Sequence, residues 1–269
     1  MKVHYLNCGT MYPPPSVLFA PHLDRSPCLC LLIEAEERLI LVDTGFGTRD
    51  MEDLSRLGPG RVILKVMPRP EETAIRQIEG MGLRPGDVSN IICTHLDRDH
   101  AGGLGDFPNA NVHVTRVEKD AALHPQSGRE RERYRPVHFE HGPKWVAYEA
   151  GTDEEWFGLP CLRTVGLPPE IVLVPLPGHT RGHCGVAIDT GDGWILHCGD
   201  AYYVKEELRL QGKAPIGVRG FRMMAHIHHG QAMKQIERLK RLIAEGNYIK
   251  MIAAHDQFEY RNLFGKPLE

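Results

Sequence analysis

Two imidazoles and two carboxylates lie within one six-residue segment, HLDRDH, at His95, Asp97, Asp99 and His100. On extended backbone, side chains two residues apart point to the same side, so His95 and Asp97 can converge on one metal ion. If the chain then turns toward a helix, Asp99 and His100 can face a second ion. Two glycines follow at once, and they permit the tight backbone that such a turn demands. The segment therefore predicts half of a metal site.

Three further metal-binding side chains come later, each just after an apolar run: His179 in PGHTRGH, Asp200 in HCGDAYY and His255 in AAHDQ. Asp43 and His95 also follow apolar runs. Architectures of the α/β class present side chains at one edge of a sheet in this way. Together the four residues of HLDRDH and these three are enough for two divalent ions that keep open positions for water.

Strand-like and helical patterns alternate along the chain. We expect strands at 28–35, 38–45, 89–94, 111–115, 171–178, 183–189, 194–200 and 248–256. The spacing of apolar residues predicts helices at 70–83, 117–124 and 226–244. Residues 125–158 are polar and aromatic without a clear period, and we interpret them as an inserted loop or helix segment near the active site.

Composition favours one domain over residues 1–269, with 42% hydrophobic and 25% charged residues. A net charge of −3 gives no electrostatic case for nucleic-acid binding, and no stretch approaches the length of a membrane span. We therefore expect a small-molecule partner and neither nucleic acid nor membrane; a homodimer is left open. Seven cysteines without a CxxC pair, and no apolar segment of signal-peptide length, predict a cytoplasmic protein.

The ordered motifs resemble those of the metallo-β-lactamase-fold hydrolases. They are VDTG (42–45), THLDRDHAGG (94–103), PGHTRGH (177–183), CGDAYY (198–203) and AAHD (253–256). The resemblance implies an α/β fold of the αββα type, in which two mixed sheets pack face to face with helices outside. It also implies a first ion on His95, Asp97 and His179, and a second on Asp99, His100 and His255, with Asp200 bridging. Asp43 would orient a ligand histidine through a hydrogen bond, and His183 is expected beside the ligands rather than among them.

Asp97 departs from the family's HxHxDH pattern, which has a histidine at this position. Two divalent ions carry +4, and three carboxylates with one bridging hydroxide carry −4, whereas a histidine at 97 would leave +1. The ions should therefore be weaker Lewis acids. We expect zinc, with manganese or iron as alternatives because oxygen-rich coordination suits harder ions.

The implied reaction is hydrolysis, in which metal-bound hydroxide attacks a small lactone or ester. Asp99 could carry the proton to the leaving group. In the N-acyl homoserine lactonases of this superfamily, a tyrosine three residues past the bridging aspartate polarises the lactone carbonyl, and Tyr203 stands at that offset from Asp200. The resemblance thus favours a lactonase, with an acyl homoserine lactone as a candidate substrate, although packing of Tyr203 on the sheet edge is an equal alternative.

Other functions remain open. A thioesterase of the glyoxalase II type or a redox di-iron protein would share the fold, and a non-catalytic metal-binding module is the alternative of a different class. A nuclease is disfavoured by charge, and an exported β-lactamase by the missing signal segment.

Several features have plainer interpretations. Cys28 is expected to be a small buried side chain, and ERERYR (130–135) a solvated charged face. His226, with His228 and His229, looks metal-like but stands at a helix start, where polar residues are common. Phe221 and the pair Met223–Met224 could line an acyl chain, yet core packing is the simpler interpretation.

Overall fold

Two β-sheets form the centre of the molecule in the computed structural model, which describes residues 1–13, 24–35, 38–149, 154–168, 170–210 and 214–268. The first sheet has the order β1 (Lys2–Met11), β2 (Ser26–Ala35), β3 (Arg38–Val42), β4 (Val88–Ile92), β5 (Asn111–Thr115), β6 (Lys144–Tyr148). The second has the order β13 (Ile249–Ile252), β12 (Trp194–His197), β11 (Cys184–Asp189), β10 (Ile171–Pro175), β9 (Leu162–Arg163). A small hairpin joins β7 (Glu155–Trp156) to β8 (Leu159–Pro160).

Both sheets mix strand directions. β1, β2 and β3 pair antiparallel, whereas β3, β4, β5 and β6 pair parallel. In the second sheet only β12 and β13 are parallel. The mixed sheets and the αββα arrangement confirm the fold class predicted from the sequence.

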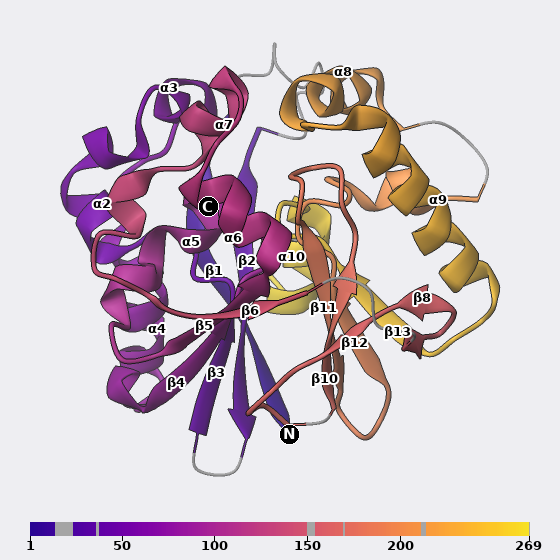
Figure 1. The fold of residues 1–269 in the computed structure, drawn as a ribbon, viewed down its shortest axis with the longest axis horizontal. Helices are drawn as coiled ribbons and strands as arrows, with labels where there is room; N and C mark the ends of the chain where they lie inside the picture. The colour runs from indigo at the N-terminus through magenta and orange to yellow at the C-terminus, as the bar shows by residue number, and fades with distance from the viewer. Residues whose placement is uncertain (14–23, 36–37, 150–153, 169, 211–213, 269) are drawn as a thin grey trace.

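The side chains of β2 are apolar on both faces of the strand, which explains why the first sheet is covered by the second sheet on one face and by helices on the other. Leu31 and Ile33 point into the core between the two sheets, and Cys30 and Leu32 point to the opposite face, under helices. Successive side chains of a strand face opposite sides, so a strand that is apolar throughout must be covered on both. The result is four layers, helices–sheet–sheet–helices, visible edge-on in Figure 1.

Helices cover the outer face of each sheet (Figure 1). The chain has, in order, α2 (Thr48–Glu52), η2 (Leu54–Leu57), α3 (Gly60–Leu64), η3 (Pro70–Glu72), α4 (Ala74–Gly80), η4 (Pro85–Asp87), α5 (Arg98–Ala101), η5 (Gly102–Asp106), α6 (Arg116–Leu123), α7 (Gly128–Arg133), η6 (Pro136–His138), η7 (Lys205–Leu208), α8 (Ile216–Ala225), α9 (His229–Ala244) and α10 (Gln257–Phe264). α4 and α6 bury Ile78 and Ala121 on the first sheet. α9 buries Ile236, Leu239 and Leu242, spaced by three residues, on the second.

The predicted strands at 28–35, 38–45, 89–94, 111–115, 171–178, 183–189, 194–200 and 248–256 are all confirmed in position, and 111–115 also in its bounds. The predicted helix at 70–83 is divided into η3 and α4, with Thr73 extended between them. Residues 125–158 contain α7, η6 and β6, so part of this segment extends the first sheet; residues 150–153 lie outside the described part. Within the described residues, no helix is long and apolar enough to cross a membrane.

Candidate metal centre

The predicted ligands meet at one end of the two sheets. Asp43 and His95 follow β3 and β4, whose parallel pairing brings their carboxyl ends together. Asp200 and His255 follow β12 and β13, which are also parallel, and His179 lies in the turn between β10 and β11. All five residues lie in the short segments that follow or connect buried strands, so the arrangement of the strands brings the side chains together.

The two glycines after HLDRDH serve a purpose other than the expected one. Neither adopts a positive φ. A Cβ on Gly102 would lie 2.5 Å from Asp50 Oδ2, and one on Gly103 would lie 3.0 Å from Thr44 Cβ. They allow the turn after β3 to approach this segment closely, and the backbone N–H of Thr44 donates to the His100 carbonyl at 2.8 Å.

The first group of candidate ligands consists of Asp97 and the two histidines beside it, His95 and His179. The Oδ2 atom of Asp97 lies 3.3 Å from His95 Nε2 and 3.1 Å from His179 Nε2. All three residues are buried. These donor atoms lie close enough together to share one ion.

Asp200 lies between this group and a second one. Its Oδ2 atom is 3.4 Å from His179 Nε2, while its Oδ1 atom is 3.2 Å from His100 Nε2 and 3.1 Å from His255 Nε2. His255 Nε2 is also 3.4 Å from Asp99 Oδ2. A carboxylate that turns one oxygen to each group is placed to bridge two ions.

Unsatisfied atoms show that these donors fit a metal. His95 Nε2, Asp97 Oδ1 and Asp200 Oδ1 are buried yet make no hydrogen bond within the described structure. Asp200 Oδ1 lies within ion-pair distance of His100 and His255 but forms no hydrogen bond with either. This is expected where several ligands surround one ion. Buried polar atoms without partners are costly, and a divalent ion would satisfy them.

Backbone and side-chain partners orient the ligand histidines. Asp43 Oδ2 lies 2.8 Å from His100 Nδ1 and accepts a hydrogen bond from the Thr94 hydroxyl, also at 2.8 Å. His255 Nδ1 donates to the Pro27 carbonyl at 2.7 Å. In both rings Nε2 therefore faces the centre.

The charge balance keeps His100 protonated when no metal is present. Burial alone would lower the pKa of His100, but Asp200 and Asp43 outweigh it and hold the pKa well above the usual value. Burial works against ionised Asp200, yet His255, His179 and His100 hold its pKa well below the usual range. Metal binding here would release that proton.

His183 is neutral and holds the bridging residue through the backbone. Its Nδ1 donates to the Leu176 carbonyl at 2.9 Å, and its Nε2 accepts from the Asp200 N–H at 3.0 Å. Burial, followed by His179, lowers its pKa to about 3. Because both ring nitrogens are engaged, His183 is no donor to an ion; it positions Asp200.

Tyr203 contacts the centre through His179. The phenol oxygen lies 3.0 Å from His179 Nδ1, and His226 Nδ1 lies 3.2 Å from the same nitrogen. Burial, followed by Arg133, lowers the pKa of His179 to about 4, so the ring is neutral. His179 Nε2 accepts a hydrogen bond from Arg133, which places the ring proton on Nδ1. That N–H can donate to the phenol oxygen, and the phenol keeps its own proton for another acceptor.

Arg133 is a residue that sequence reasoning missed. The segment 130–135 is not the solvated face that was expected: Glu130 and Tyr134 are buried, and Arg133 reaches the metal centre. Only the neighbouring charges at Arg129, Arg131 and Glu132 are exposed. A six-residue helix with one buried face has too short a pattern for its periodicity to be read from sequence.

Glu118 was also missed. Its Oε1 accepts from the Leu96 N–H and the Tyr134 hydroxyl, both at 3.0 Å, and its Oε2 accepts from the Thr180 hydroxyl at 2.7 Å and the Gly182 N–H at 3.0 Å. The carboxylate thus ties the loop that carries His95 to the loop that carries His179. Its place on α6 predicts nothing of this, because the partners come from distant loops.

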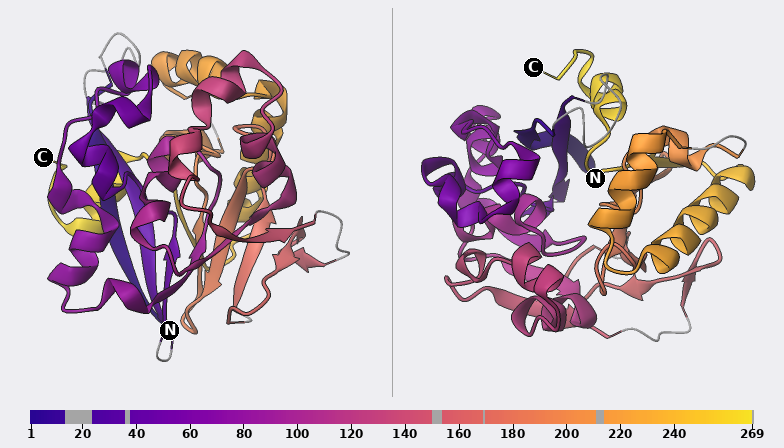
Figure 2. Two further views of the ribbon diagram at one scale, coloured as in Figure 1. Left: turned by 60° about the vertical axis from the view of Figure 1, so that its left-hand side comes forward. Right: turned by 90° about the horizontal axis from the view of Figure 1, so that it is seen from above.

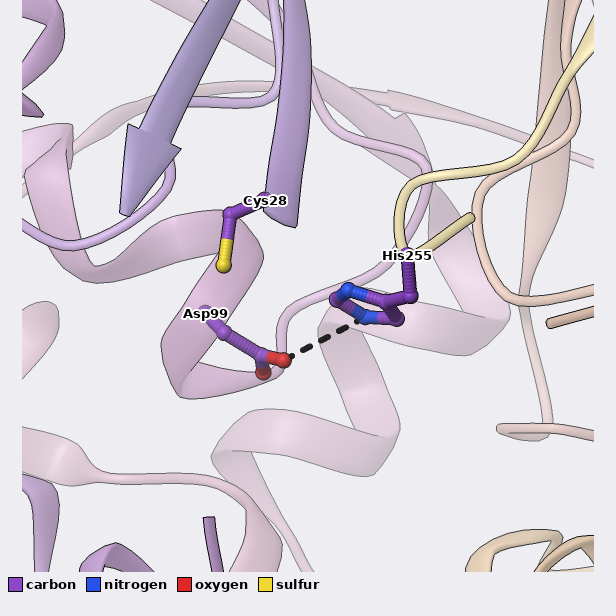
Figure 3. A group of neighbouring side chains, drawn as sticks. All are labelled: Cys28, Asp99 and His255. Atoms are coloured by element: carbon purple, nitrogen blue, oxygen red, sulfur yellow. Dashed lines mark ion pairs between the residues drawn. The ribbon is translucent and has the colours of Figure 1, made fainter. Parts of the chain in front are cut away.

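Cys28 approaches the second group. Its side chain is buried, as expected, but it points from the start of β2 toward Asp99 and His255 (Figure 3). The three donor atoms lie within 4.8 Å of one another. Burial and then Asp99 raise the pKa of the thiol well above its usual value, so the thiol is protonated without a metal.

A cavity of about 670 Å³ opens onto the centre and reaches Asp97, Asp99, Asp200, His255 and Tyr203. Its walls include Ile63 and Leu64 of α3 and Phe221 and Met224 of α8. Seen from above in Figure 2, α8 stands across the molecule from the helices of the N-terminal half. The exposed Met223 and Met224 do not pack in the core, contrary to the simpler expectation.

The chain is similar in sequence to known proteins. The model of the Metallo-beta-lactamase superfamily matches residues 23–250. A probable metallo-hydrolase of Mycobacterium tuberculosis is 41% identical over 264 residues, which cover 97% of this chain and 82% of the relative. An N-acyl homoserine lactonase of Bacillus thuringiensis is 31% identical over 194 residues, 71% of this chain and 70% of the relative.

Solved structures are similar over nearly the whole length. An N-acyl homoserine lactone hydrolase with N-hexanoyl-L-homoserine bound at its catalytic metal centre has a TM-score of 0.71 at 25% identity, covering 99% of this chain and 98% of that one. The dizinc quorum-quenching lactonase AidC shares the fold, with a TM-score of 0.62 at 17% identity over 94% of this chain and 87% of that one.

Proposed function

Because this chain belongs to the metallo-beta-lactamase superfamily and is a metallo-hydrolase of that fold, we propose that it opens a small lactone or ester, with N-acyl homoserine lactones as the first candidates. The observation that supports this best is the cavity: one end reaches five of the seven candidate ligands, and apolar side chains of α3 and α8 line part of its walls. This shape suits a substrate with a polar ring and an apolar chain.

We propose His95, Asp97 and His179 as ligands of one ion, Asp99, His100 and His255 as ligands of another, and Asp200 as the residue shared by both. Two divalent ions, zinc in our proposal, would supply Lewis acidity and a more acidic water when bound. Asp97 leaves manganese and iron as alternatives, because it adds an oxygen donor.

Two side chains would move or hold protons. Asp99 lines the cavity and would carry a proton toward the leaving alcohol. Tyr203 would donate its phenol proton to the carbonyl oxygen; burial and then Asp200 raise its pKa well above the usual value, so it stays a donor at neutral pH. Asp43 and His183 hold ligand residues in place and touch no substrate.

We further propose that residues 1–269 act as one catalytic domain, with 125–158 shaping the cavity through α7. The cytoplasmic location and the oligomeric state remain predictions.

The test combines metal analysis with a substrate panel. Protein purified without added metal should contain zinc, zinc-saturated protein should hold two ions per chain, and acyl homoserine lactones should be turned over faster than thioesters or phosphodiesters. A thioester preferred over every lactone would replace the lactonase with a thioesterase. A metal-loaded structure with His179 or His255 more than about 4 Å from any ion would contradict the ligand set, since zinc–nitrogen bonds are near 2 Å.

A further inference from the structure

Arg133, the last residue of α7, places a permanent positive charge among the candidate ligands. Its side chain is 13% exposed. Its Nη1 group donates to Asp97 Oδ2 and, at 2.7 Å, to His179 Nε2. Its Nη2 group donates to the carbonyl of Ala225 at the end of α8. Guanidinium stays charged at all physiological pH values, so this cation cannot be removed by deprotonation.

An ion in the first group would need the same atoms. The lone pair on His179 Nε2 that accepts the Arg133 hydrogen bond is the one an ion would use, and Asp97 Oδ2 is shared in the same way. A divalent ion and a guanidinium cannot both occupy this space, because they repel and compete for the same donors. Binding of the first ion therefore requires Arg133 to withdraw from His179.

The second group contains no permanent positive charge within the described residues, because a proton on one of its histidines can leave when an ion binds. Asp99 makes an ion pair with His255 and, within the described residues, with no arginine or lysine. No permanent charge of the protein therefore neutralises Asp99. Asp97, by contrast, is already neutralised by Arg133, so the two groups differ in effective charge although each contains one aspartate and shares Asp200.

We propose that Asp97 and Arg133 act as one unit that makes the metal centre asymmetric: the second group fills first and tightly, and the first group binds its ion more weakly because Arg133 must be displaced. The proposal rests on the proposed ligands but not on the identity of the substrate.

Metal titration tests this directly. Metal-free protein is titrated with zinc against a chromophoric chelator, and bound zinc is counted by mass spectrometry. The wild-type protein should bind one zinc tightly and a second at least tenfold more weakly. Arg133→Met should tighten the weaker step at least tenfold, and Arg133→Gln, which also removes the charge, should do the same. Arg131→Met, an exposed arginine on the same helix, is the control and should behave as wild type.

A double-mutant cycle tests the unit itself. Asp97→His supplies a neutral nitrogen donor but leaves Arg133 beside it without a carboxylate, so the weaker step should weaken further. Asp97→His combined with Arg133→Met should restore two tight steps, a strongly non-additive result. Thermal melts of each metal-free variant show whether it is folded.

The outcomes separate the two proposals. Two ions bound with affinities that neither Arg133 variant changes, or additive effects in the cycle, would overturn the role of Arg133 and leave the metal centre intact. No zinc bound by folded wild-type protein would overturn the proposed metal centre itself.

Discussion

At the scale of residues, the tautomer of His179 decides what Tyr203 can do. With the ring proton on Nδ1, the histidine donates to the phenol oxygen at 3.0 Å. Tyr203 makes no second hydrogen bond through this oxygen within the described residues, and it lines the cavity. Its proton is therefore available to a substrate oxygen, and the ring at the same time packs against Phe221, with centroids 5.0 Å apart.

Tyr203→Phe separates the donor from the packing. The variant keeps the ring but removes the O–H, so kcat for the best lactone should fall on the order of a hundredfold, while zinc content and melting temperature stay unchanged. Tyr248→Phe, at an exposed tyrosine, is the control. Turnover at the wild-type rate in Tyr203→Phe would show that Tyr203 only packs, and the lactone assignment would lose one of its supports.

At the scale of elements, short helices build the site that the strands position. α3 and α8 line the cavity, and α7 brings Arg133 to Asp97. α6 carries Glu118, whose four hydrogen bonds hold together two loops that bear ligands. Burial raises the pKa of Glu118, and the hydrogen bonds from Thr180 and Leu96 lower it, so these donors offset part of the cost of burying the carboxylate. The strands thus place the candidate ligands, and the helices line the cavity beside them.

Two neighbouring methionines of α8 allow a matched test of the cavity wall. Met224 lines the cavity and Met223 does not, although both are about equally exposed, at 60% and 63%. Met224→Ser should lower kcat/KM for a decanoyl lactone several-fold more than for a butanoyl lactone, because each buried methylene contributes about 0.8 kcal/mol. Met223→Ser should leave the ratio unchanged. Equal losses for both chain lengths in Met224→Ser would place the acyl chain elsewhere.

At the scale of the whole molecule, buried neutral histidines couple folding to pH. His113 on β5 lies 2.6 Å from the Tyr148 hydroxyl and 2.9 Å from Asn90 Oδ1, and its ring forms no hydrogen bond to a candidate metal ligand within the described residues. Burial lowers its pKa from 6.5 to about 4. The unfolded chain therefore takes up this proton first, and the stability that the neutral ring contributes is lost as the pH falls from about 6.5 toward 4.

The free energy of unfolding should therefore fall measurably as the pH is lowered. Between pH 7 and pH 5, the titration of His113 should cost about 2 kcal/mol of unfolding free energy. Urea unfolding with a chelator present should show that His113→Gln loses about 2 kcal/mol less than wild type over this range. His124→Gln, at an exposed histidine, should keep the wild-type slope. An unchanged slope in His113→Gln would mean that His113 keeps an ordinary pKa in the folded protein.

The sequence by itself determined the strands and the order of the candidate ligands. A short apolar run predicts a buried strand, and a polar residue soon after it is expected at the edge of the sheet. This local pattern is enough to place Asp43, His95, Asp200 and His255 at the sheet edge. The family resemblance, confirmed by the comparisons, supplied the αββα arrangement. These features depend on local pattern or on motif order along the chain.

Only the tertiary structure decided which other groups enter the centre. Arg133 meets Asp97 across 36 positions of sequence, and Glu118 meets Thr180 across 62. Cys28 faces Asp99 although its surrounding sequence is that of an ordinary core strand. Such contacts arise where loops and short helices pack over the sheet ends. Their side chains follow no repeating pattern in the sequence. On a six-residue helix such as α7, neighbouring positions can differ in burial, so that one charged residue is exposed and the next is buried.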